Sequence, residues 1–179
     1  MGDSTMDVVI VGGGLAGIAT AYYLGKQGVR STVIERDAVG SHASGFAYGG
    51  LGALDGVGVH GPTQTIATAS MRLHRDLAVS LPEETGINTE FRERPGIALC
   101  YTDDEIRTAK ANLRLREKQS EYECRWLDRD ELLAMEPRIS PDAIGAAYAE
   151  GTVDLEPYRF ILAMAQAAEG LGTTIRHGT

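Results

Sequence analysis

Three glycines and one acid near the start of the chain have the types and spacing of a phosphate-binding site. The glycines occur as Gly12-x-Gly14-x-x-Gly17, and Glu35 lies 21 residues after Gly14. In this pattern Gly12 permits a tight turn, Gly14 leaves room for a phosphate beside the backbone, and Gly17 lets the following helix pack close to a strand. The N–H groups at the start of that helix then face the anion. The pattern predicts a site for the pyrophosphate of a dinucleotide.

The elements that must position these residues are a strand, a helix and a second strand. Residues 6–11 form a short β-branched run with no polar residue after Asp7, as in a strand covered on both faces. Residues 18–28 have small and apolar side chains at helical spacing, and residues 31–35 form the next strand. This βαβ context favours a dinucleotide site over the alternative, an ordinary glycine-rich turn. Glu35 would accept hydrogen bonds from the adenosine ribose, and its charge would repel the 2′-phosphate of NADP.

Length and composition are those of a packed globular protein. The chain has 179 residues, of which 43% are hydrophobic and 23% charged, which excludes collagen-like, disordered and coiled-coil classes. Its 17 Lys and Arg against 25 Asp and Glu give a net charge of −8, which disfavours a nucleic-acid partner. Fifteen of the 22 glycines fall within the first 61 residues, and this concentration indicates a functional site there.

Other residue types indicate the compartment and limit the chemistry. No run of 18 apolar residues occurs, so neither a membrane span nor a signal peptide is expected. Cys100 and Cys124 are too few for a disulfide framework, which favours a reducing compartment, the cytoplasm. His60, His74 and His177 are too scattered for metal ligation, and no metal site is expected. No Ser-His-Asp arrangement or paired carboxylates occur, so no catalytic residue is predicted.

The rest of the chain alternates between helical and extended patterns. Helices are expected over residues 63–81, 103–121, 128–135 and 156–171, and strands over residues 90–94, 96–101, 144–149 and 173–176. Pro82 is expected to lie beyond the end of the first of these helices. Residues 36–61 lack periodicity and are expected to form a long loop. The last strand is expected to run parallel beside the strand that ends at Glu35.

Several segments resemble one known family. Residues 8–17, 21–24 and 33–36 are similar to the N-terminus of the FAD-dependent D-amino-acid oxidase superfamily, which includes glycine, sarcosine and dimethylglycine oxidases and dehydrogenases. Residues 40–51 resemble the second flavin segment of that family, a loop of small residues that plain NAD-binding Rossmann domains lack. Residues 84–86, 95–97 and 153–179 follow the same pattern. The resemblance covers nearly the whole chain, but only the N-terminal half of a typical member.

The resemblance implies an α/β fold in which a Rossmann-like FAD-binding domain, with a parallel sheet and a βαβ unit, carries the start of an inserted mixed-sheet substrate domain. Residues 1–88 are expected to form the FAD-binding domain and residues 89–150 the beginning of the substrate domain. Residues 151–179 are expected to add the return helix and strand of the FAD-binding domain. The chain is accordingly expected to be a truncated enzyme or one part of a split one.

The cofactor that the resemblance implies is FAD. Small residues in the second loop would let backbone amides approach the flavin, whereas without the resemblance this segment could be a flexible surface loop. Arg36 could stack against adenine or lie on the surface. The residues expected to contact FAD are Gly12, Gly14, Leu15, Ala16, Gly17, Glu35, Arg36, Ser44, Gly45, Gly49, Gly50 and Leu51, with His42, Ala43, Ala47 and Tyr48 as further candidates.

His42 has two interpretations. Some relatives tether FAD covalently through a histidine in this loop, and residues 42–45 resemble the tethered His-Ala-Ala-Gly string. An alignment on residues 49–51 places Ala47 at that position instead. The other interpretation is a loop histidine that is exposed to solvent or makes a hydrogen bond.

The activity implied by the resemblance is oxidation of the C–N bond of a small amine or amino acid, with hydride transfer to flavin N5. Dioxygen or an electron carrier would reoxidise the flavin, and the missing C-terminal half or another subunit would complete the enzyme. Three alternatives stay open: a non-catalytic FAD-binding fragment or subunit, a flavin-dependent tRNA-modifying enzyme, and a plain NAD dehydrogenase. The net charge of −8 disfavours the second of these.

Overall fold

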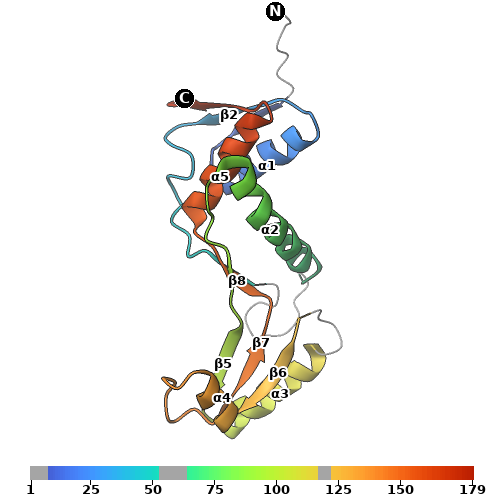
Figure 1. The fold of residues 1–179 in the computed structure, drawn as a ribbon, viewed down its shortest axis with the longest axis vertical. Helices are drawn as coiled ribbons and strands as arrows, with labels where there is room; N and C mark the ends of the chain where they lie inside the picture. Colours follow the sequence, from blue (N-terminus) through green and yellow to red (C-terminus); the bar gives the residue numbers. More distant parts are fainter. Residues whose placement is uncertain (1–7, 53–63, 117–121) are drawn as a thin grey trace, which may run out of the picture. The chain divides into compact units, whose positions relative to one another are not determined.

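The computed structural model describes residues 8–52, 64–116 and 122–179, which form two compact units (Figure 1). The first unit comprises the described residues up to Gly49 together with Arg75–Phe91 and Leu155–Thr179, and the second comprises the rest. The chain leaves the first unit at residue 50, earlier than the expected domain boundary after residue 88. The reason is that residues 50–52 pair with a strand of the second unit.

The first unit contains a parallel sheet of three strands. Strands β1 (Val8–Val11), β2 (Ser31–Glu35) and β9 (Thr174–His177) lie in the order β1-β2-β9. Val9 pairs with Thr32, and Val33 pairs with Ile175. The predicted βαβ unit and the return strand beside β2 are therefore confirmed.

Three helices contribute to the core of the first unit. They are α1 (Leu15–Lys26), the C-terminal part of α2 (Gln64–Thr85), and α5 (Pro157–Gly170). Figure 1 shows α1 and α5 beside each other. Burial of apolar surface stabilises this arrangement by roughly 25 cal/mol per Å². The fully buried core side chains include Ile18, Tyr22, Val33, Leu81 and Ile161.

Helix α2 corrects one expectation about its end. Pro82 lies inside this helix, which continues to Thr85, rather than beyond its end. A proline removes one helical N–H donor, but Leu77 and Leu81, which precede it in the helix, are buried in the core and favour a continuous helix. The last turn is closed by bonds from Gly86 N–H to the Pro82 carbonyl and from the Thr85 hydroxyl to the Leu81 carbonyl.

The described part of the second unit contains two small sheets, the helices α3 and α4, and the N-terminal part of α2. One sheet has the order β3-β8-β4, formed by Gly50–Gly52, Thr152–Asp154 and Arg92–Glu93. The other has the order β5-β7-β6, formed by Gly96–Cys100, Gly145–Ala149 and Cys124–Asp128. Helix α3 (Asp103–Arg116) follows β5, and helix α4 (Arg129–Met135) follows β6.

Neighbouring strands of the second unit pair antiparallel throughout the described residues. Strands β5 and β6 both run opposite to β7 between them, so the two run in the same direction. Strands β3, β6 and β8 were not expected from the sequence. The glycines of β3 have low strand propensity, and the mixture of Arg, Trp and Asp in β6 does not alternate.

Helix α4 begins with a capping box that should contribute measurably to stability. The Asp128 carboxylate accepts the N–H of Glu131 at 2.9 Å, and the Glu131 carboxylate accepts the N–H of Asp128 at 3.1 Å. We expect Asp128→Ala to lower the free energy of unfolding by about 1 kcal/mol. Asp128→Asn should retain most of the stability that the cap contributes. Urea denaturation measures the difference. Asp142→Ala is the matched control on an exposed turn, and an equal loss in this variant would contradict the prediction.

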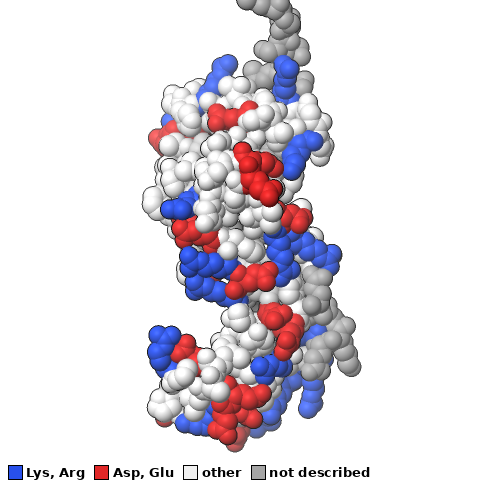
Figure 2. Space-filling model, viewed as in Figure 1, with Lys and Arg blue, Asp and Glu red and all other residues white. Residues whose placement is uncertain are grey.

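The surface carries charges of both signs. Figure 2 shows Lys and Arg interspersed with Asp and Glu on the face drawn, without an extended basic area there. Backbone phosphates of nucleic acid require such an area for tight binding. No helix among the described residues is both long and apolar enough to cross a lipid bilayer.

Candidate cofactor-binding site

The turn between β1 and α1 brings the three motif glycines together. Gly12 has a φ of 104°, in the left-handed region that favours glycine, and its N–H donates to the Ile34 carbonyl at 2.8 Å. A β-carbon on Gly17 would collide with the carbonyl oxygen of Gly12. Glycine at position 17 therefore allows the first turn of α1 to lie directly against the end of β1, as the spacing predicts.

The start of α1 is suited to an anion. Gly14 is the N-cap residue and offers no side-chain acceptor to the first N–H groups, and the first turn holds no acidic residue. The N–H groups and the positive end of the helix dipole thus favour a negatively charged group beside them. Leu15 and Ala16, both predicted to contact the cofactor, are exposed on this first turn.

Glu35 is tied to the same turn. Its carboxylate accepts the N–H of Gly13 at 2.6 Å and the N–H of Asp37 at 2.8 Å, and the residue is 8% exposed. The N–H groups of Asp37 and Gly13 hold the pKa of the Glu35 carboxyl below its ordinary value, because they stabilise the charged form. Glu35 is therefore ionised at neutral pH beside the glycine turn. Its bond to a ribose hydroxyl stays a prediction.

The second loop returns to the glycine turn. Gly40 N–H donates to the Gly13 carbonyl at 3.0 Å, and the N–H of Leu15 donates to the Ser44 hydroxyl oxygen at 3.2 Å. A β-carbon on Gly45 would collide with the carbonyl oxygen of Gly40, so this turn of the loop also requires a residue without a side chain. The structure thus brings Ser44 and its neighbours to the start of α1.

The other candidates have different surroundings or face solvent. Gly49 has a φ of 86°, and a β-carbon there would collide with the Leu155 carbonyl oxygen. Gly50 and Leu51 belong to β3 in the second unit, where they pair with Asp154 and Val153. Four further candidates are exposed: Arg36, Ala43, Ala47 and Tyr48. FAD contacts by these residues stay predictions.

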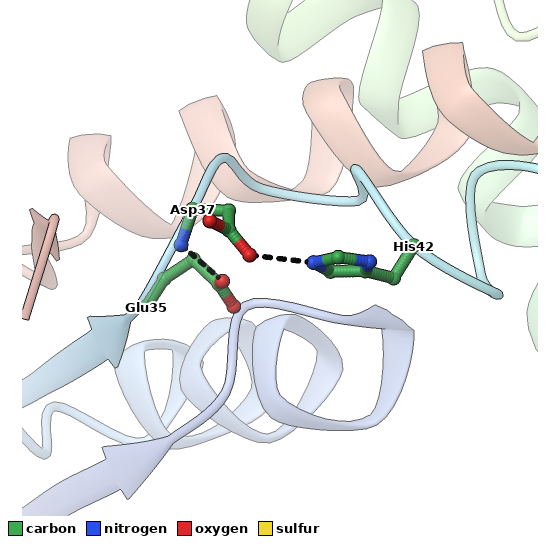
Figure 3. A group of neighbouring side chains, drawn as sticks. All are labelled: Glu35, Asp37 and His42. Atoms are coloured by element: carbon green, nitrogen blue, oxygen red, sulfur yellow. Dashed lines mark hydrogen bonds and ion pairs between the residues drawn. The ribbon is translucent and has the colours of Figure 1, made fainter.

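Two polar residues of the loop were not singled out from the sequence. Asp37 lies between Glu35 and His42, and its carboxylate oxygen Oδ2 is 2.7 Å from His42 Nε2 (Figure 3). Ser41 Oγ is buried and has no hydrogen-bond partner within the described ranges. Both residues lie in a polar segment directly after β2, which is a weak sequence signal for a functional role because single polar residues are common in loops. Only the folded loop distinguishes Asp37 and Ser41 from other polar loop residues.

The side chains of Glu35, Asp37 and His42 come close enough to raise the question of a cation. Their ligand-type atoms lie within 4.8 Å of one another. Hydrogen bonds within the protein account for this closeness, since Asp37 bonds to both of the others. We interpret the group as part of the loop structure, and the expected lack of a metal site stays a prediction.

The fold and the glycine turn define a dinucleotide-binding α/β domain. A comparison with protein families identifies it further, because the family model described as DAO, FAD dependent oxidoreductase, matches residues 7–179. The chain belongs to this family of FAD-dependent oxidoreductases. The resemblance seen in the sequence and the expected α/β fold are thereby confirmed.

Individual relatives agree with this assignment. The glycine oxidase of Geobacillus kaustophilus is 34% identical over 170 residues, which cover 94% of this chain and 45% of the relative. Its crystal structure matches with a TM-score of 0.86 at 32% identity, over 96% of this chain and 46% of that one. The glycine oxidase of Bacillus subtilis is 28% identical over 169 residues, 94% of this chain and 44% of the relative.

A third relative is a hydrogen cyanide synthase subunit of Pseudomonas aeruginosa, 28% identical over 209 aligned residues that cover 98% of this chain and 50% of the relative. The chain thus spans about half the length of the curated relatives it matches.

The residues present fit FAD, the cofactor of this family. The first turn of α1 holds no acidic residue that would repel a pyrophosphate, and the ionised Glu35 lies at the end of β2. The buried Ser41 hydroxyl, next to the loop residue that bonds Gly13, leaves a polar atom for a ligand. This turn and loop are therefore the candidate cofactor site, and their contacts with FAD stay predictions.

Proposed function

We propose that this chain supplies the FAD-binding part of an enzyme that oxidises the C–N bond of a small amine or amino acid. The observation that carries the proposal is the bonding of the second loop to the glycine turn, through Gly40 and Ser44. A plain NAD-binding turn needs no such loop. The names of the glycine oxidase relatives support a small amino acid as the substrate.

The chemistry of the bound cofactor would be acceptance of a hydride from the carbon next to the amine nitrogen. The residues of this chain would hold and orient FAD rather than transfer protons. The start of α1 would hold the pyrophosphate, and Glu35 the adenosine ribose. Ser44 and the glycines of the loop would let the backbone approach the cofactor. Dioxygen or an electron carrier would then take up the electrons.

A further polypeptide segment would complete the enzyme. Strand β1 is at the edge of its sheet within the described residues, and its Val9 and Val11 are 54% and 85% exposed. Strands of a parallel sheet are normally covered on both faces. The exposed valines support a covering layer from the remainder of the protein or from another subunit. Cys100 and Cys124 are buried free thiols, which supports a cytoplasmic location.

The proposal predicts flavin reduction by a small amino acid. We expect the purified full-length gene product to bind FAD and to lose its visible absorbance when glycine or a related amine is added without oxygen. A spectrum before and after addition of each member of an amine panel measures this. Admission of air should restore the absorbance if dioxygen is the acceptor.

Other outcomes would identify the alternatives. Bound flavin that no amine reduces would favour a non-catalytic FAD-binding protein. Salt-dependent binding of transfer RNA would favour an RNA-modifying enzyme, against which the mixed charges in Figure 2 argue. Binding of NAD without flavin would contradict the proposal.

A further inference from the structure

The second loop is fixed to the cofactor turn at two points, and its own shape depends on His42. The carbonyl of His42 accepts the N–H of Gly45 at 3.0 Å and the N–H of Phe46 at 3.3 Å. This turn contains Ser44, whose hydroxyl accepts the N–H of Leu15 at the start of α1. The position of the His42 backbone therefore decides where Ser44 meets the helix.

The His42 side chain joins this turn of the loop to Asp37, at the beginning of the loop. Its Nε2 lies 2.7 Å from Asp37 Oδ2, and the same oxygen accepts a bond from Arg36 Nε at 3.0 Å. The backbone N–H of Asp37 in turn donates to Glu35. Figure 3 shows the three side chains in this sequence, from the end of β2 to the loop. One continuous chain of bonds thus joins the ribose-binding candidate Glu35 to His42.

Charged and titratable groups of the loop, β9 and α5 lie around the bond between His42 and Asp37. The titratable and charged groups around the loop are Glu35 and Asp37, Arg36, His177 of β9, whose Nδ1 lies 3.3 Å from the Asp37 carbonyl oxygen, and Tyr158 of α5, which packs beside the loop glycines. Hydrogen bonds from His42 and Arg36 lower the pKa of the Asp37 carboxyl.

We propose that His42 is a positioning residue for FAD, which holds residues 37–45 against the glycine turn through its bond to Asp37. The inference rests on the FAD binding proposed above. A loop that is closed before the cofactor arrives loses less conformational freedom on binding, so the bond raises the affinity.

The expected size of the effect on FAD affinity follows from the solvent exposure of the two side chains. The side chains of His42 and Asp37 are 62% and 47% exposed, so solvent screens their attraction. Exposed ion pairs of this kind change an equilibrium by about two- to fivefold. We therefore expect loss of the bond between His42 and Asp37 to weaken FAD binding about two- to fivefold.

The test compares the FAD affinity of four variants with that of the original protein, by titration of flavin fluorescence. His42→Ala should weaken FAD binding about two- to fivefold, because it removes the side chain that bonds Asp37. Asp37→Asn, which removes the carboxylate that His42 and Arg36 contact, should weaken FAD binding by a similar factor. His42→Gln keeps a donor for Asp37 and should bind FAD nearly as tightly as the original protein does. His74→Gln, in the second unit, is the matched control and should leave FAD affinity unchanged.

A second measurement does not depend on FAD. Amide hydrogen exchange at Gly40 and Gly45 should accelerate in His42→Ala and Asp37→Asn without cofactor, and stay unchanged in His74→Gln. Equal FAD affinities of the original protein, His42→Ala and Asp37→Asn, with unchanged exchange, would overturn the proposal. Flavin that stays attached after acid denaturation would also overturn it, since His42 would then be a covalent tether. If the protein takes up no FAD but the variants show the expected changes in hydrogen exchange, the proposed FAD function would be wrong, whereas the role of His42 in the loop would stand.

Discussion

Gly17→Ala is expected to lower FAD affinity about 100-fold and the free energy of unfolding by about 1–3 kcal/mol. The added β-carbon would collide with the Gly12 carbonyl oxygen, which is backbone and cannot rotate away. Gly12 is itself held by its bond to the Ile34 carbonyl and by its positive φ. The first turn of α1 must therefore move, and its N–H groups would lose their alignment on the pyrophosphate. Flavin fluorescence and urea denaturation measure the two effects.

The matched control is Gly170→Ala. A β-carbon on Gly170, near the end of α5, has no heavy atom within 4 Å outside its immediate neighbourhood. Alanine favours a helix over glycine by up to about 1 kcal/mol, so this variant should be as stable as the original protein or slightly more stable. Its FAD affinity should not change. An affinity for FAD in Gly17→Ala within threefold of the original would contradict the prediction.

A substitution at a second glycine should change FAD binding without changing stability. A β-carbon on Gly14 would lie 3.2 Å from Ser44 Oγ, a close contact that a small movement of the serine relieves. Gly14→Ala should therefore leave stability nearly unchanged and still weaken FAD binding, because the methyl group occupies space that the phosphate needs.

Glu35→Gln is expected to lower the free energy of unfolding at pH 7 by about 1–3 kcal/mol and FAD affinity by about 10- to 100-fold. The nearly isosteric amide cannot accept the N–H groups of both Gly13 and Asp37 with its two atoms, since one of them is a donor. Loss of the charge also weakens the expected bonds to the ribose hydroxyls. Urea denaturation over a range of pH and FAD titration measure the effects.

The pH dependence of this loss has a definite sign. The N–H groups of Asp37 and Gly13 lower the pKa of Glu35 in the folded protein. The stability that the carboxylate contributes is therefore present above its unfolded pKa, about 4.3, and is lost as the pH falls through the lower folded pKa. The gap between Glu35→Gln and the original protein should close in acid. A constant gap from pH 7 to pH 3 would contradict the prediction. Glu169→Gln, at an exposed position of α5, is the control.

The sequence alone was sufficient to predict the secondary-structure elements around the cofactor turn. The apolar run of β1, the glycine spacing and the acid at the end of β2 each have a local cause, and together they predicted a βαβ unit that the structure confirms. Local signals also located α5, because Pro157 and the capping residue Glu156 start it. Such features depend on residues close together in the chain, so a single sequence contains them.

The tertiary structure alone decided features that depend on distant residues. Helix α2 continues through Pro82 because Leu81 is buried against other elements, which local propensity does not indicate. Strand β3 forms because it pairs with β8, about a hundred residues later in the chain. The bond between Asp37 and His42, and the contact of Ser44 with Leu15, likewise require the loop to fold back on α1. Local residue types specified the cofactor turn, whereas long-range packing and pairing decided how the second loop meets it.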